Sequence, residues 1–458
     1  MAEAQDGAKL AGTIKTAGSQ GLQFNENGKS MRDVKRLSFA SVTVCALTVA
    51  GAHAQADNYY SRDKYTAVLD RSQPEFDPAP VRLGTFVVRP SAEAGVSYTD
   101  NVLASDQDKE SGTIATGALL ARGDTDWSVH SIGFDVSARR SEYLDQSSES
   151  YNDLRARVRG RLDVTRAISI GAAAYAEDRV EPRTDFSSAF SPDAPIEFTV
   201  QGAEGYINYQ NDRVRWTNNV GVRKEDYENA TQIGTGLPID QGFRDNTQTT
   251  ATSRLAYAVS PDLAVFGQGT YRVRDYDEQQ DFGGILRSRD SKGYTAAVGV
   301  DFELTSLVRG EIAIGYLNET KDDSFFEDVS GLSVDGRFLW FPSQLTTVTL
   351  TGGRSVTDTG VFDSPTAIYS RVGARVDHEL RRNIILSATA EYSDYSYEEI
   401  DRSDELVSLG LQATYKMSPR VHFNTFVERD DRDVSGTSVL GAPAFGVTTV
   451  GVGVRLFP

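Results

Sequence analysis

The chain has 458 residues, a formal net charge of −18 and a hydrophobic content of 39%. This acidic balance argues against a nucleic-acid footprint, which needs clustered lysine and arginine, and one cysteine with four histidines leaves little material for a disulfide framework or a zinc site. No apolar run is long enough for a membrane-spanning helix. A count of 21 Phe, 20 Tyr and 40 Gly favours a β-rich chain instead. This composition is also compatible with a membrane β-barrel, because alternating apolar and polar residues keep the mean hydropathy of such a protein low.

The first part of the chain has the features of an export signal. Residues 1–30 are polar and without pattern, so they form an extension that is not translated if synthesis starts at Met31. A basic stretch then precedes the apolar segment Leu37 to Ala50, and Ala52-His53-Ala54 fits the small-x-small cleavage rule. We expect residues 31–54 to be a secretory signal peptide that is removed after Ala54.

Residues 55–85 form a polar lead-in on the periplasmic side, ahead of a barrel over residues 86–458. The lead-in is too short for a folded domain. A flexible linker is the favoured interpretation, and a plug inside the barrel or a binding segment for a periplasmic partner is the alternative.

From Phe86 onward, segments of about 12–15 residues alternate apolar with polar or small residues, which is the period of a β-strand. Short, turn-rich junctions separate every second pair of segments, and the other junctions are long and acidic. The pattern predicts 18 strands, over residues 86–98, 111–122, 127–143, 151–164, 167–180, 196–210, 213–227, 247–259, 263–277, 292–304, 308–321, 329–341, 345–357, 366–380, 384–395, 404–417, 421–432 and 445–457.

Strand length separates the possible all-β folds. A propeller also repeats near 40 residues, but its strands are short, like the average soluble strand of about 5–6 residues. The segments here match a tilted membrane crossing of about 9–11 residues with extensions. An open sheet of this size would leave edges exposed. We therefore expect a transmembrane, antiparallel up-and-down β-barrel with long extracellular loops and short periplasmic turns.

The inside and outside of this barrel can be assigned from the alternation. Leu154, Val158 and Leu162 fall on one face of their strand, and four arginines fall on the other. The apolar face is expected to contact lipid. Aromatic residues near strand ends predict two interfacial girdles, made of Trp127, Trp216 and Trp340 near the short turns and Tyr98, Tyr143, Tyr227 and Tyr392 near the long loops.

Several stretches mark turns and strand starts in a way that resembles a known family. They include Pro74-Glu75-Phe76-Asp77-Pro78, Gly95-Val96-Ser97-Tyr98-Thr99-Asp100-Asn101-Val102, Gly160-Arg161-Leu162-Asp163-Val164-Thr165-Arg166, Leu307-Val308-Arg309-Gly310-Glu311-Ile312 and Val376-Asp377-His378-Glu379-Leu380-Arg381-Arg382-Asn383. The chain resembles the β-barrel porins of bacterial outer membranes that are associated with capsule and exopolysaccharide loci, chiefly the alphaproteobacterial members. The resemblance implies a channel-like protein of the outer membrane, in some members accompanying polysaccharide export, and it carries no active-site motif.

The inward face holds the candidate functional residues. The candidates for lining and selectivity are Arg155, Arg157, Arg159, Arg161, Arg213, Arg215, Arg272, Arg274, Arg371 and Arg375. Guanidinium groups pair with carboxylates or phosphates, so this wall favours acidic sugars or small anions. The alternative is that lumen acids such as Asp135, Asp163, Glu225, Glu311 and Glu391 pair with these arginines and brace the wall.

The long loops concentrate acidic residues, in the runs Asp106–Glu110, Glu319–Asp328, Glu398–Glu405 and Glu428–Asp433. One interpretation is divalent-cation bridging to lipopolysaccharide or acidic polymers. Ordinary solvated loops are the simpler one, because no loop carries a calcium-binding pattern. We therefore predict no metal site and no cofactor.

An enzyme is not expected. After removal of the signal peptide only His130, His378 and His422 remain, all near short turns, and none stands in a catalytic motif. The leading function is a conduit for hydrophilic solute or secreted polysaccharide in the outer membrane of a Gram-negative bacterium. Its expected partners are outer-membrane lipid, lipopolysaccharide, the barrel-assembly machinery, and acidic polysaccharide or small anions. The alternative is an occluded barrel that supports surface-polymer assembly without an open pore.

Overall fold

The computed structural model describes residues 66–186, 192–232, 234–437 and 442–458. The predicted signal peptide and the polar extension before it lie outside these residues. Within them, no helix is both long enough and apolar enough to cross a membrane.

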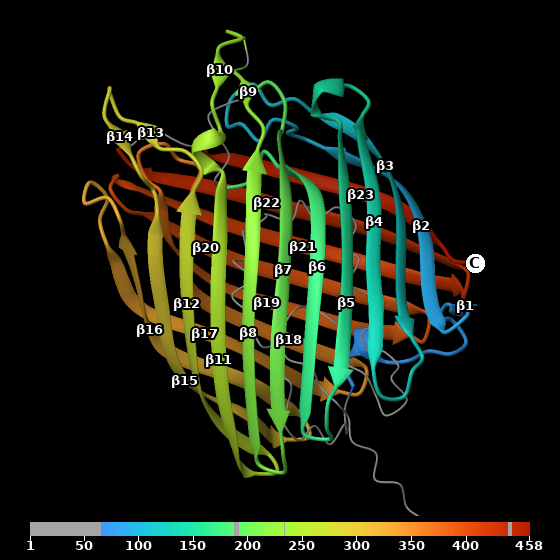
Figure 1. The fold of residues 1–458 in the computed structure, drawn as a ribbon. Helices are drawn as coiled ribbons and strands as arrows, with labels where there is room; N and C mark the ends of the chain where they lie inside the picture. Colours follow the sequence, from blue (N-terminus) through green and yellow to red (C-terminus); the bar gives the residue numbers. More distant parts are fainter. Residues whose placement is uncertain (1–65, 187–191, 233, 438–441) are drawn as a thin grey trace, which may run out of the picture.

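One antiparallel sheet makes up most of the molecule (Figure 1). It holds 19 strands. The short β1 (Val81–Leu83) pairs only with the start of β2 and is not part of the barrel wall proper. The other 18 strands are β2 (Phe86–Thr99), β3 (Gly112–Thr125), β4 (Ser131–Tyr143), β5 (Tyr151–Asp163), β6 (Ile168–Glu181), β7 (Ile196–Gln210), β8 (Val214–Tyr227), β11 (Asn246–Ser260), β12 (Leu263–Tyr276), β15 (Ser291–Thr305), β16 (Val308–Lys321), β17 (Val329–Ser343), β18 (Thr346–Asp358), β19 (Thr366–Arg381), β20 (Ile384–Tyr397), β21 (Arg402–Ser418), β22 (Val421–Gly436) and β23 (Phe445–Leu456).

The sheet closes on itself. Each long strand pairs with its neighbours in sequence, and β2 pairs with β23 from Ala92↔Leu456 to Thr99↔Thr449. The predicted closed barrel of 18 strands is therefore confirmed, with boundaries that agree within a few residues. Closure leaves no long edge with unpaired backbone groups.

Connections at the two ends of the barrel differ in length (Figure 1). At the short-turn end, two or three residues usually join the strands, and β1 forms a hairpin with β2 through Gly84, whose φ of 63° is left-handed and suits glycine. At the long-loop end, the connections carry small hairpins of their own, β9 (Ala230–Thr231) with β10 (Pro238–Ile239) and β13 (Gln280–Asp281) with β14 (Leu286–Arg287).

Side chains alternate between an exterior and an interior face along each strand. In β5, Leu154, Val158 and Leu162 are exposed on the exterior, with Val158 at 57%, although they are apolar. Arg157, between two of them, is partly covered on the interior side. Exposed aliphatic side chains recur on the other strands, so an apolar belt surrounds a polar interior.

Parts of three acidic runs belong to strands rather than to loops, including residues 402–405 of β21, where Asp404 is buried. Residues 428–433 belong to β22, where Asp430 is buried, and Glu319 is buried near the end of β16. β22 continues past its predicted end at residue 432, whereas β16 ends at Lys321 as predicted. Ion pairs and hydrogen bonds inside the barrel compensate the buried charge.

Candidate functional site

The interior of the barrel is the candidate site, and the arginine ladder of β5 is its most regular element. The ladder is Arg155, Arg157, Arg159 and Arg161. Each member has a carboxylate partner: Asp153 for Arg155 at 3.8 Å, Glu204 for Arg157, Asp124 and Asp135 for Arg159, and Asp163 for Arg161 at 3.1 Å. Neighbouring acids thus offset most of the ladder's positive charge.

The remaining arginine candidates differ in the partners that surround them. Arg272, Arg274 and Arg375 have carboxylate neighbours, with Arg375 3.0 Å from Asp377. Arg371 has no hydrogen bond or ion pair with any residue that the structure describes.

Arg213 and Arg215 differ although they are close in sequence. Arg215 lies on the interior row of β8, which also carries Thr217 and Arg223. Arg213 sits in the turn before that strand, and its guanidinium approaches the hydroxyl of Tyr257 at 3.5 Å. Tyr257 is an exposed side chain of the exterior face, so the structure does not bring Arg213 to the lumen.

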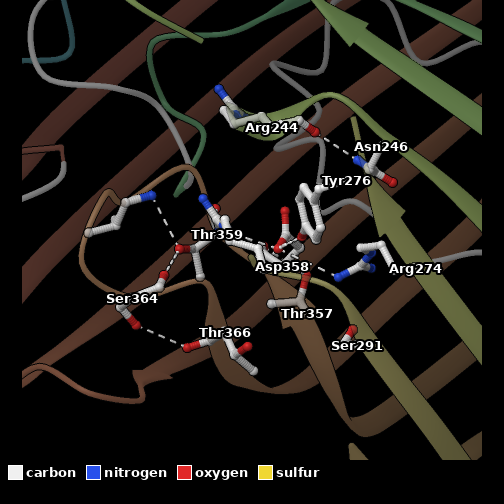
Figure 2. Close-up of polar contacts among 12 residues, drawn as sticks. Arg244, Asn246, Arg274, Tyr276, Ser291, Thr357, Asp358, Thr359, Ser364 and Thr366 are labelled. Carbon is white, nitrogen blue, oxygen red and sulfur yellow. Dashed lines mark hydrogen bonds and ion pairs between the residues drawn. The ribbon is translucent and has the colours of Figure 1, made fainter. Parts of the chain in front are cut away.

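At the long-loop end, Asp358 is the centre of a buried polar network (Figure 2). One oxygen of its carboxylate accepts a hydrogen bond from the hydroxyl of Tyr276 and lies 3.5 Å from Arg274 and 3.4 Å from Arg289. Arg289 is 0% exposed and donates to the carbonyl of Thr359 at 2.6 Å. This network ties the loop between β12 and β15 to the end of β18.

A second arginine of the loops is fully enclosed. Arg244, in the loop before β11, donates to Glu181 at 2.5 Å and to Gln241 at 2.9 Å, and its guanidinium lies 4.0 Å from the ring centre of Tyr227. Burial alone lowers the pKa of Arg244, but Glu181 and Tyr227 more than offset this effect, so its pKa lies above the ordinary value. The arginine therefore stays charged and fastens its loop to β6.

The loop that joins β6 to β7 reaches the wall that lies nearly opposite around the barrel. The ring of Phe186 stacks on Tyr395 at 4.1 Å, and its carbonyl accepts a hydrogen bond from the hydroxyl of Tyr397 at 3.1 Å. Arg432 donates to the carbonyl of Thr184 at 2.6 Å. The described part of this loop, which we call the crossing loop, spans the long-loop end.

At the short-turn end, the described part of the lead-in, residues 66–80, packs against the interior of the barrel. The backbone N–H of Val68 donates to Thr347 at 2.9 Å, and Arg71 pairs with Glu379 at 2.8 Å. Lys416 donates to Gln73 at 2.5 Å. The favoured linker interpretation is wrong for this part, because these contacts fix it in place.

The residues of the predicted girdles divide between the exterior and the interior face of the barrel. The exposed exterior side chains among them are Trp127, Trp216, Trp340, Tyr98 and Tyr392. Tyr143 and Tyr227 instead occupy interior rows. Tyr227, 9% exposed, stacks on Phe198 at 4.9 Å. Its position two residues after Glu225, an interior residue of the same strand, puts it on the interior face.

Sequence reasoning missed several interior arginines. Arg254 makes a two-pronged contact with Glu311, at 2.7 Å for both bonds, and lies 3.5 Å from the ring centre of Phe266. The parity of β11, in which Arg254 shares a row with Thr252 and Ala256, gives a signal that could have found it. No comparable signal marks Arg289, because it lies in a loop.

No group of acidic, histidine or cysteine side chains in the described residues has an arrangement that could hold a metal ion. The interior offers paired charges and hydroxyl groups, which can interact with water and with polar solutes.

Solved structures with a similar fold include OccK2 (OpdF) of Pseudomonas aeruginosa in complex with glucuronate, with 10% identity, a TM-score of 0.45 and coverage of 81% of this chain and 98% of that chain. A BenF-like porin from Pseudomonas fluorescens Pf-5 has 8% identity and a TM-score of 0.44, with 81% and 99% coverage. The copper transporter OprC has 10% identity and a TM-score of 0.46, with 83% and 81% coverage.

No curated protein sequence matches the chain. The model of the family described as "Putative beta-barrel porin 2" matches residues 73–457. This match covers the described lead-in from Gln73 and all 18 strands of the barrel. The chain therefore belongs to this family of β-barrel porins.

Proposed function

We propose that the protein is a passive conduit for hydrophilic solutes in the outer membrane of a Gram-negative bacterium. The observation that carries this proposal is the contrast between the two faces of one closed wall, apolar outside and charged inside. The exterior belt suits lipid, and the paired charges and hydroxyl groups of the interior suit a hydrated passage. The long loops then face the outside and the short turns face the periplasm.

For the cargo, we infer acidic solutes, including the acidic sugars of exported polysaccharide. The support comes from the interior arginines that neighbouring acids offset least. Arg371 has no partner among the described residues, and the side chain of Arg155 is half exposed, 3.8 Å from Asp153. Such groups can exchange a water molecule for a carboxylate.

Conductance of the purified barrel in a planar lipid bilayer tests both parts. We expect discrete channel openings. In a salt gradient, we expect a reversal potential whose sign shows selectivity for anions over cations. Replacing Arg371 and Arg155 by Gln should shift the selectivity towards cations, whereas Arg420→Gln, at an exposed turn, should not. A strong cation preference in the unmodified protein contradicts the acidic cargo, and a sealed barrel contradicts the conduit.

A second candidate function is an occluded barrel that supports surface-polymer assembly. It is favoured by the crossing loop and the lead-in, which occupy opposite ends of the interior. Deleting residues 66–80 separates the candidates. A rise in conductance supports a conduit with a removable plug, and loss of surface polymer with no change in conductance supports the assembly role.

The environment of the barrel is part of the proposal. Lipid and lipopolysaccharide would cover the exterior belt, and the assembly machinery would insert the chain. The final strand, which ends close to Phe457, has the alternating pattern that such machinery reads in outer-membrane proteins. Reconstitution into vesicles with and without lipopolysaccharide would measure its contribution to stability.

A further inference from the structure

The lead-in does not fill the space that it covers. A cavity of about 110 Å³ lies between it and the interior wall formed by β2 and β20 to β23. The lead-in contributes Leu69, Asp77, Pro78 and Ala79, and the wall contributes charged, amide and apolar side chains. We call this space the lead-in cavity.

The charges around the lead-in cavity do not cancel. Lys416 lies 3.4 Å from Asp77, and Arg455 lies 3.1 Å from Glu93, so two cations and two carboxylates form pairs.

Arg89 is the third cation that lines the cavity. No hydrogen bond or ion pair joins it to any residue between 66 and 458 that the structure describes. One guanidinium charge is therefore left without a counter-charge.

The cavity also has unused hydrogen-bonding capacity. Asn424 lines it, and both polar atoms of its amide are buried without a partner in the described structure. Unpartnered buried polar groups are rare in folded proteins and call for a water molecule, an ion or a ligand. Gln412 and Thr414 add further polar groups to the same wall.

We propose that the lead-in cavity is a binding site for a small anionic group, a carboxylate or a phosphate, held by Arg89. A guanidinium binds either anion through parallel charged hydrogen bonds. An apolar cavity of about 150 Å³ takes up benzene, so this space accepts an ion of a few heavy atoms or the charged end of a larger solute. The proposal rests on the conduit function. It adds a site at which an acidic solute binds transiently, between the lead-in and the wall, during passage.

Titration calorimetry of the detergent-solubilised full barrel, with sodium phosphate and sodium acetate in a chloride buffer, tests the site. We expect one binding event for at least one of the two ions, with affinity reduced about tenfold or more in Arg89→Gln. Asn424→Leu, which keeps the size of a side chain six residues further along the wall by the register of β2, β23 and β22, should leave this affinity unchanged.

Arg420→Gln is the matched control, because it removes the same charge from an exposed turn at the same end of the barrel. It should bind like the unmodified protein. Heat-modifiable mobility on gels shows whether each variant has folded. Absence of binding by the unmodified protein, or binding that Arg89→Gln leaves unchanged, overturns the proposal.

The calorimetry does not depend on ion flow, so its outcome is separate from the conduit proposal. If the barrel binds phosphate or acetate through Arg89 but does not conduct, the binding site is supported and the conduit function is contradicted. If the barrel conducts but binds neither ion, the conduit function is supported and the binding site is contradicted.

Discussion

The two ends of the barrel interior are covered in different ways. At the long-loop end, the crossing loop and its neighbours are connected to strands on both sides and hold buried groups such as Arg289 and Phe186. At the short-turn end, the lead-in is connected to the barrel only through β1, and polar contacts such as Lys416 with Gln73 fix the rest. The comparison teaches that the long-loop end is part of the folded barrel, whereas we expect the lead-in to undock without disturbing the wall.

The largest effect is expected at the long-loop end, from Asp358→Ala. This change leaves Arg274 and Arg289 buried without the carboxylate that they share, which costs about 3–5 kcal/mol of the free energy of unfolding. Denaturant titration of the folded barrel measures it. Asp106→Ala, in an exposed loop, serves as the control and should change the free energy by less than about 0.5 kcal/mol. Equal effects of the two variants would mean that this network does not hold the loops.

Phe186→Ala should release the crossing loop while the wall stays folded. The lost burial of the ring corresponds to about 1.5–3 kcal/mol of loop docking. Single-channel conductance should rise as the loop leaves the lumen. Leu237→Ala, at an exposed loop position, should leave the conductance unchanged. Unchanged conductance in Phe186→Ala would place the narrowest point elsewhere.

At the short-turn end, Thr347→Val should loosen the lead-in only. It removes the acceptor for the buried N–H of Val68, at a cost of about 1 kcal/mol to docking. Hydrogen exchange at the Val68 amide and protease cleavage of the lead-in should speed up, with no change in the unfolding of the barrel. Thr349→Val, on the same interior row, is the control. A drop in barrel stability would contradict the independence of the lead-in.

The smallest effect is a pH dependence of the loop after β20. Burial raises the pKa of Glu399 above its ordinary value, against the hydrogen bond from the backbone of Glu327. The carboxyl group of Glu399 therefore binds its proton more tightly in the docked loop than in the free loop. Its contribution to stability is full below the ordinary glutamate pKa and is lost as the pH rises through the raised value.

Hydrogen exchange at the Glu327 amide across this pH range measures the dependence, after correction for intrinsic exchange. Glu399→Gln keeps a neutral side chain at every pH and should remove the dependence. A dependence of equal size in that variant would assign the titration to another group.

The strands of the barrel wall could be predicted from local sequence patterns. The segments that fold into the interior, the crossing loop and the lead-in, could not. Alternation and turn residues set the strands, and the parity of β5 places Val158 outside and Arg157 inside. The same parity, applied to β8, would have moved Tyr227 to the interior. The contacts of Thr184 with Arg432 and of Gln73 with Lys416 join residues hundreds of positions apart, so no repeat or turn signals them.

The pairing of β2 with β23 has a consequence for the order of assembly. The lead-in comes before every strand of the wall, yet its docking groups Thr347, Glu379 and Lys416 lie on late strands. We therefore expect the lead-in to dock stably only once β23 has paired with β2 and brought these strands next to the start of the chain. Resistance of the lead-in to protease should therefore indicate that the barrel has closed. A protease-sensitive lead-in should indicate a barrel in which β2 and β23 have not yet paired.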